Sequence, residues 1–188
     1  PLIMGDESTL CINKDAAKTP YEVRVKVSVD KADELIPSGT VFTFKFTVKD
    51  EQGAALGSEV VETKTIEENL AQGHSFEYVF TEKAQMPKGK SVIALSTSFN
   101  DGEEDYSGLG SKELSYVDNP VVTLPAEYKD TKSPVEVKPT VEGGEAPYTY
   151  TWNGKTGESS YSSEGGPLKL LVTDKNNCQA EANTVVNI

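Results

Sequence analysis

The 188-residue sequence has few of the residues from which most catalytic and metal sites are built. It contains one histidine, His74, two cysteines, Cys11 and Cys178, and one arginine, Arg24. Zinc sites and activated nucleophiles depend mainly on clustered His and Cys side chains, so these classes of site lack their parts here. No nucleophile or second ligand is signalled near His74, and we expect no catalytic role for it.

Positive charge is also scarce, and long apolar runs are absent. Eighteen Lys and Arg stand against thirty Asp and Glu, which gives a formal net charge of −12. Nucleic acids and anionic membrane surfaces are bound by clustered Lys and Arg, so we exclude both as partners. No run of eighteen apolar residues is present, which excludes a transmembrane helix. Residues 1–6 show no basic segment followed by an apolar one, so any export signal was removed or never present.

The two cysteines lie near opposite ends of the chain, in what we expect to be different domains. This separation favours two unpaired, partly buried thiols. The alternative is a disulfide that joins the first strand to the last hairpin. The cysteine count therefore indicates nothing firm about the redox compartment.

Short segments in which apolar and polar residues alternate dominate the sequence, and this period of two is typical of strands with one face in a core. In residues 41–48, for example, Phe42, Phe44, Phe46 and Val48 share one face. The expected strands before residue 119 are 9–13, 21–29, 41–48, 59–66, 75–81, 91–99 and 112–117. Gly-, Pro- and Asn-containing turns separate them, a spacing typical of an antiparallel sandwich. The one helical candidate, residues 66–71, is expected to be a single turn between sheets.

The pattern resets at Asp118-Asn119-Pro120, where proline suits a linker that leads into the next strand. Downstream, apolar residues alternate again, at Val135, Val137 and Val141, at Leu168, Leu170 and Val172, and at Val186 and Ile188. The predicted fold class is all-β, with two tandem Ig-like antiparallel β-sandwiches over residues 1–119 and 120–188. The second is near the lower size limit for independent stability, so we expect it to depend partly on its neighbour.

Residues 146–154, A-P-Y-T-Y-T-W-N-G, and 170–178, L-L-V-T-D-K-N-N-C, resemble the short Ig-like SprB-type repeats of gliding-motility adhesins and, more distantly, polycystic-kidney-disease (PKD) domains. The resemblance implies a small sandwich of the kind found on exported proteins of Bacteroidota. Two positions depart from the pattern. Asn177 replaces the usual glycine before the cysteine, although asparagine tolerates a left-handed φ. Pro167-Leu168 replaces the aromatic residue that usually follows the glycine pair.

Residues 22–116 carry a second resemblance. P-S-G-T-x-F-x-F-x-F-x-V-K-D-E-x-G over residues 37–53, A-x-G-x-S-F-E-Y-x-F over 71–80 and M-P-K-G-K over 86–90 are similar to bacterial cell-adhesion-related (CARDB-like) and fibronectin-type modules. Such turns recur in unrelated sandwiches, so this resemblance supports the fold more than common ancestry.

Acidic residues are densest at Asp101, Glu103, Glu104 and Asp105, where oxygen ligands in a loop could hold calcium. The EF-hand spacing is absent, and an acidic hairpin tip that keeps the protein soluble explains the same residues. The same two interpretations apply to the second acidic group, which consists of Asp30, Asp33 and Glu34. Thirty acids also make a chance pair for glycoside hydrolysis inevitable, but nothing in the sequence fixes such a pair.

Aromatic residues could form a platform on which sugar rings stack. The alternation places Tyr148, Tyr150 and Trp152 on one strand face, which is most simply the core of the second sandwich. Tyr106 and Tyr161 are expected in loops, and they are the better candidates for an exposed glycan-binding ring.

The sequence therefore predicts a non-catalytic module, without a required cofactor, of an extracellular or cell-surface protein, either secreted or attached to the outer membrane. It would serve adhesion to a protein or glycan, or act as a structural spacer, within a larger protein. The chief alternative is a carbohydrate-binding or ancillary module of a secreted polysaccharide-processing system. A third is a spacer made rigid by calcium at Asp101, Glu103 and Asp105.

Overall fold

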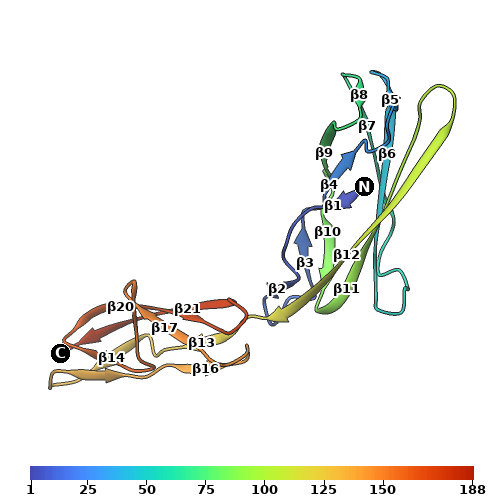
Figure 1. Ribbon diagram of the computed structural model, residues 1–188. Helices are drawn as coiled ribbons and strands as arrows, with labels where there is room; N and C mark the ends of the chain where they lie inside the picture. Colours follow the sequence, from blue (N-terminus) through green and yellow to red (C-terminus); the bar gives the residue numbers. More distant parts are fainter. The chain divides into compact units, whose positions relative to one another are not determined.

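The computed structural model describes every residue from Pro1 to Ile188, and each regular element in it is a β-strand (Figure 1). The chain divides into two compact units. The first unit consists of Pro1–Ser8 and Ala17–Tyr116, and the second of Thr9–Ala16 and Val117–Ile188. The predicted fold class, all-β with two tandem Ig-like sandwiches, is confirmed. The structure groups Thr9–Ala16 with the second unit, whereas a boundary after residue 119 would group this segment with the first.

The larger sheet of the first unit is built on two long strands that form a hairpin. Its strand order is β2-β12-β11-β6-β7, in which β2 and the last two residues of β12 are counted with the second unit. The bounds are β2 (Thr9–Ile12), β6 (Val41–Lys49), β7 (Val60–Thr65), β11 (Gly89–Asn100) and β12 (Asp105–Asp118). Strand β2 borders only the end of β12, where the amide of Ser115 donates to the carbonyl of Ser8 and that of Asn119 to the carbonyl of Ile12.

Three smaller sheets complete the first unit, in the orders β1-β4-β9, β10-β3 and β5-β8. Their strands are β1 (Leu2–Ile3), β3 (Lys18–Tyr21), β4 (Arg24–Ser28), β5 (Leu35–Ile36), β8 (Leu70–Ala71), β9 (Ser75–Val79) and β10 (Ala84–Pro87). Tyr78 of strand β9 and Phe80, which follows the strand, turn their rings toward the aromatic residues of β6. The ring of Phe44 stacks on Tyr78 at 4.4 Å between centroids, and Phe46 meets Phe80 edge-on at 4.7 Å. The alternating aromatics of the two strands therefore form one interior, as their period of two predicts.

Three local expectations for the first unit were wrong. The strand expected over residues 21–29 is two strands, because Tyr21 pairs with Ala84 while Arg24 pairs with Val79 in a different sheet. Residues 66–71 form no helical turn, since Leu70 pairs instead with Ile36 in a short antiparallel ladder. Strand β12 begins at Asp105 rather than at residue 112 because its whole length pairs with β11.

The second unit has one five-stranded sheet and two short ladders. The sheet order is β14-β21-β20-β17-β18, and the ladders are β13-β16 and β15-β19. The bounds are β13 (Val121–Thr123), β14 (Glu127–Lys129), β15 (Val135–Val137), β16 (Thr140–Glu142), β17 (Thr149–Trp152), β18 (Lys155–Gly157), β19 (Tyr161–Ser163), β20 (Gly166–Thr173) and β21 (Gln179–Asn187). Strand β14 runs parallel to β21, and the other pairs are antiparallel.

The interior of the second unit is centred on Trp152, which is 2% exposed. Its indole Nε1 donates to the carbonyl oxygen of Glu158 at 3.0 Å, which satisfies the one polar atom of the ring. The buried cluster around it comprises Val135, Val137, Leu168, Leu170, Val172 and Val186, with Tyr148 and Tyr150 packed against it. The prediction that this aromatic strand faces the core is confirmed. Ile188, which continues the alternation of Val186 in the sequence, is 53% exposed because it follows the end of β21.

No helix of the structure has the length and apolar character needed to cross a membrane.

Candidate functional site

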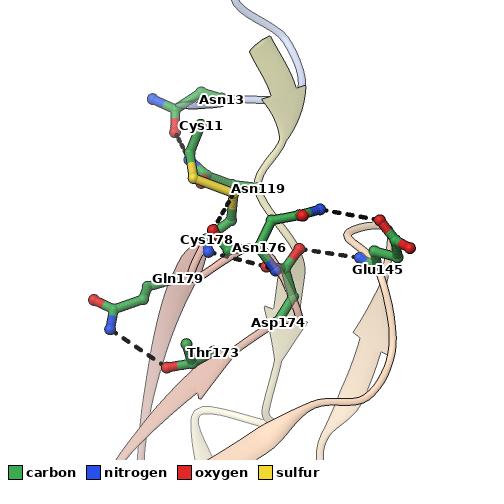
Figure 2. The surroundings of a disulfide bond; sticks show 9 residues. All are labelled: Cys11, Asn13, Asn119, Glu145, Thr173, Asp174, Asn176, Cys178 and Gln179. Carbon is green, nitrogen blue, oxygen red and sulfur yellow. Dashed lines mark hydrogen bonds between the residues drawn. A yellow bond between two sulfur atoms is a disulfide. The ribbon is translucent and has the colours of Figure 1, made fainter. Parts of the chain in front are cut away.

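A disulfide between Cys11 and Cys178 is the main covalent feature of the second unit (Figure 2). The two Cα atoms lie 5.6 Å apart although the residues are separated by 167 positions. The expectation of two unpaired thiols was wrong, because it assumed that the cysteines belong to different domains. The segment Thr9–Ala16 belongs to the same compact unit as Cys178, and this brings the two sulfur atoms together.

The carboxylate of Asp174 organises the loop that carries Cys178. Its Oδ1 accepts the amides of Asn176 at 2.8 Å and of Cys178 at 2.9 Å, and its Oδ2 accepts the amide of Glu145 at 3.0 Å (Figure 2). Asn177 adopts the left-handed conformation expected at this position, with φ of 62°. Asp174 is 5% exposed, and three amide donors compensate for the burial of its charge. Cys178 is held in place by two hydrogen bonds to Asp174, one from its amide to the carboxylate and one from the amide of Asp174 to its carbonyl. The V-T-D motif in the sequence does not by itself predict these contacts.

Carboxylates elsewhere in the loops have the same structural role. Asp50 Oδ1 accepts the amides of Gln52 and Ala54, at 3.0 and 2.8 Å. Asp130 Oδ1 accepts the amides of the two residues that follow it, at 2.7 and 3.2 Å. In each case the side chain replaces a backbone acceptor within its own turn.

The acidic hairpin tip follows this pattern too. Asp101 Oδ1 accepts the amides of Glu103 and Glu104, each at 2.9 Å, and these hydrogen bonds hold the pKa of Asp101 below its usual value. Asp105 accepts the side-chain amide of Asn100 at 2.9 Å. The structure brings no three His, Cys, Asp or Glu side chains together in a group that could hold a metal ion. The calcium assignment to Asp101, Glu103 and Asp105 stays a prediction, as does the one for Asp30, Asp33 and Glu34.

Tyr106 lies in strand β12, not in the loop where we expected it, and its ring stacks on Phe99 at 5.0 Å between centroids. An open hollow of about 490 Å³ adjoins the pair. Its walls carry Val41, Thr43, Ser98, Asn100, Asp105 and Ser107. Burial and the neighbouring carboxylates of Asp101 and Glu104 raise the pKa of the Tyr106 hydroxyl, which stays a neutral hydrogen-bond donor at physiological pH.

A second hollow of about 170 Å³ shares Phe99 and Tyr106 with the first. Thr97 lines it and is 5% exposed, and the hydroxyl of Thr97 has no hydrogen-bond partner. A buried hydroxyl without a partner is unusual in a protein interior. Aromatic surface, amide, carboxylate and hydroxyl groups therefore gather at one end of the β11–β12 hairpin.

Tyr161 lies in strand β19 rather than in a loop, is 36% exposed, and stacks on Trp152 at 5.3 Å. It lines none of the five hollows described for the two units. The structure does not bring the two tyrosines of the glycan hypothesis into one site, because they belong to different units.

Sequence reasoning missed one polar site, which joins β7 to the segment after β9. Glu62 Oε1 accepts the Tyr78 hydroxyl at 2.7 Å and the Thr81 amide at 2.8 Å, and Oε2 accepts the Glu82 amide at 3.0 Å. Burial opposes the charge on Glu62, but these hydrogen bonds outweigh it and hold the pKa of Glu62 below its usual value. Burial, together with the bond to Glu62, raises the pKa of Tyr78 to about 12. No motif links these residues, so no sequence signal could have found them.

The side chain of His74 contacts its own turn, and its backbone carbonyl accepts the amide of Val29 at 3.0 Å. Its Nδ1 accepts the amide of Ala71 at 3.4 Å, and its amide donates to the carbonyl of the same residue at 3.0 Å. Both contacts close the turn between β8 and β9.

The packing and topology of both units define the chain as a pair of tandem Ig-like β-sandwiches. No family model matches the chain, and no curated protein matches it. The resemblances of residues 146–178 to SprB-type repeats and of residues 22–116 to CARDB-like modules therefore stay predictions.

Solved structures of tandem β-sandwich proteins are similar to the chain. A C-terminal 282-residue fragment of intimin, in complex with the intimin-binding domain of its translocated receptor, matches 98% of this chain at 16% identity, with a TM-score of 0.47. The D1–D4 ectodomain fragment of ICAM-5 matches 98% at 9% identity and a TM-score of 0.39. The fibronectin(III)-like modules of Clostridium thermocellum CbhA match 99% at 11% identity and a TM-score of 0.37. The chain spans 63% of the intimin fragment and 52% of the ICAM-5 fragment.

Proposed function

We propose that the chain is a non-catalytic tandem Ig-like module of an exported or surface-attached protein, where it serves adhesion or separates other domains as a spacer. The observation that carries this proposal is the use of the loop carboxylates. Asp50, Asp101, Asp130 and Asp174 each accept amides of their own turns. An acid or base in catalysis must be free to exchange a proton with a substrate, and these groups are committed to holding loops.

The disulfide supports the extracellular part of the proposal. Structural disulfides persist in oxidising environments such as the cell surface and the bacterial periplasm. The Cys11–Cys178 bond is therefore typical of an exported protein. The net charge of −12 fits the same setting, because strong like charge keeps a surface-displayed module from self-association. A protein or a glycan at the cell surface is the partner that this proposal implies.

Replacement of the chain within its full-length protein tests the proposal and separates adhesion from spacing. One strain carries the protein with residues 1–188 deleted, and a matched strain carries an unrelated tandem Ig pair in their place. A spacer predicts that the unrelated pair restores attachment of cells to a coated surface, whereas an adhesive module predicts that it does not. Protease treatment of intact cells should cleave the protein. An intracellular protein with two reduced cysteines would contradict the proposal.

A second candidate function is carbohydrate binding by the first unit, and the hollow beside Tyr106 favours it. Sugar rings stack on aromatic faces and are oriented by a few amide, carboxylate and hydroxyl groups, and this hollow presents both kinds of surface. Tyr161 lacks such surroundings. A glycan array should then show binding that Tyr106→Ala abolishes and Tyr161→Ala leaves intact. Binding that neither substitution changes would contradict the assignment.

The calcium-stabilised spacer remains a separate proposal with a simple test. If Asp101, Glu103 and Asp105 bind calcium, a chelator lowers the midpoint of the thermal transition of the first unit. An unchanged midpoint would dismiss calcium at this hairpin.

A further inference from the structure

The connectivity of the disulfide has a mechanical consequence for a module that is pulled through its ends. Cys11 and Cys178 enclose residues 12–177 in one covalent loop. A force that enters the chain before Cys11 and leaves it after Cys178 can pass from one flank to the other through the two sulfur atoms.

We propose that the Cys11–Cys178 bond is a covalent load path that removes residues 12–177 from the line of force. This inference rests on the proposed role as an adhesive or spacer module, because only such a module is pulled through its ends. In its oxidised state the chain is then almost inextensible, and both β-sandwiches stay folded at forces that unfold Ig-like domains loaded end to end.

The flank after Cys178 is already extended. Residues Gln179–Asn187 form strand β21, which pairs with β20 over eight residues and with β14 over three. A strand rises about 3.3 Å per residue, close to the limit of a stretched chain. Tension between Cys178 and residue 188 therefore adds almost no length. Because both ends of β21 carry the load, the hydrogen bonds to its neighbours need not resist it.

The flank before Cys11 supplies the only slack. Strand β1 holds it to the first unit through two residue pairs, Leu2 with Lys26 and Ile3 with Val25. The amide of Met4 donates to the carbonyl of Arg24 at 2.8 Å, and the carbonyl of Ser8 accepts the amide of Ser115 at 2.8 Å. The Tyr21 hydroxyl donates to Glu7, and the Lys112 ammonium donates to the carbonyls of Met4 and Gly5. These non-covalent contacts lie on the loaded path and yield before the disulfide, and residues 1–11 then straighten by at most about 40 Å.

The length hidden behind the disulfide is much larger. The separation of 167 residues corresponds to roughly 550–600 Å of extended chain, while residues 1–11 and 178–188 together hold roughly 75 Å. Cleavage of one bond therefore changes the extensible length of the protein about eightfold. The extensible length of the protein is therefore set by whether Cys11 and Cys178 are oxidised or reduced.

Single-molecule force spectroscopy on the whole chain, with handles before residue 1 and after residue 188, tests the proposal. The oxidised protein should lengthen by no more than about 40 Å, the slack of residues 1–11. When a thiol reductant is added to the same molecule under constant force, it should lengthen by several hundred ångströms as the two units unfold. The double variant Cys11→Ser/Cys178→Ser should show the long extension without reductant.

A matched control moves the second handle to Gln52, an exposed turn residue inside the covalent loop, and is pulled in the oxidised and in the reduced state. Pulling from residue 1 to Gln52 should unfold the first unit and release up to roughly 170 Å, with or without reductant. This control shows that the unit can be unfolded when it is loaded directly.

Extension by several hundred ångströms of end-pulled wild-type protein that has no titratable thiols would overturn the proposal. So would a reduced molecule that stays as short as the oxidised one while the Gln52 control unfolds. Neither result depends on a ligand or on cell attachment, so failure of the load path is distinguishable from failure of the adhesive or spacer role.

Discussion

Removal of the Cys11–Cys178 bond by the double substitution Cys11→Ser/Cys178→Ser should destabilise the second unit in particular. The bond closes a loop of 167 residues. The entropy of closing a loop that long is worth about 5 kcal/mol in the unfolded state. If the first unit stays folded while the second unfolds, only residues 12–16 and 117–177 are flexible, and the same relation gives about 4.4 kcal/mol. The expected loss is thus about 4–5 kcal/mol.

That loss is large relative to the stability of the second unit. A domain of roughly 80 residues has a free energy of unfolding of about 4–12 kcal/mol, so the variant should be marginally folded at 25 °C. Trp152 is the only tryptophan of the chain and lies 2% exposed in the core of this unit, so its fluorescence reports the second unit alone. Urea titration followed by tryptophan emission should show the transition at much lower denaturant in the variant.

Wild-type protein titrated with and without a thiol reductant is the matched measurement, because it changes the bond without changing a side chain. Both experiments should move the tryptophan transition by the same amount. A shift below about 0.5 kcal/mol in both would refute the reasoning, since it would mean that the bond does not restrict the unfolded second unit.

Three further predictions concern single side chains. Glu62→Gln should cost the first unit about 1–3 kcal/mol at pH 7. Folding lowers the pKa of Glu62, so the stability difference between wild type and variant is present above about pH 4.5, where the unfolded carboxyl is ionised, and is lost as pH falls through the folded pKa. Urea titrations of both proteins at pH 7 and pH 3 measure this difference. An equal stability difference at the two pH values would contradict the prediction. Asp174→Asn places an NH₂ donor where a carboxylate oxygen accepted an amide, and should lower the stability of the second unit by about 1–3 kcal/mol, measured by Trp152 emission. Gly143→Ala and Gly144→Ala form a matched pair, because the two glycines have nearly the same φ, +66° and +65°. Only at Gly144 would the new Cβ lie 2.8 Å from a carboxylate oxygen, that of Asp174, so the melting midpoint of Gly144→Ala should fall further than that of Gly143→Ala. Equal midpoints would contradict a steric clash between the new Cβ and Asp174.

The sequence predicted the features that depend on local pattern. Phe42, Phe44 and Phe46 are buried and their neighbours are not, because a period of two in a strand places alternate side chains on opposite faces. The same rule placed Trp152 in the core of the second unit. These predictions needed no knowledge of which strands pair.

Features that depend on pairing between distant segments were beyond the sequence. The strand predicted over residues 21–29 is split after Tyr21 because β3 pairs with β10 whereas β4 pairs with β9. Apolar and polar side chains alternate in the same way along one long strand and along two short ones, so the sequence pattern could not show the split. The disulfide was only the less favoured alternative for a related reason, since the grouping of Thr9–Ala16 with the second unit is set by tertiary contacts. Tyr106 was expected in a loop because the strand after it was predicted to begin only at residue 112, whereas pairing with β11 extends that strand back to Asp105.

The most direct test of the account is the redox state and connectivity of the two cysteines in protein made in an oxidising compartment. Monomeric protein is alkylated without reduction, digested, and analysed by mass spectrometry. We predict one pair of peptides, containing Cys11 and Cys178, that remains joined until reductant is added. Alkylation of both cysteines before reduction, or a link that occurs only between two chains, would contradict both the covalent closure of the second unit and the load path built on it.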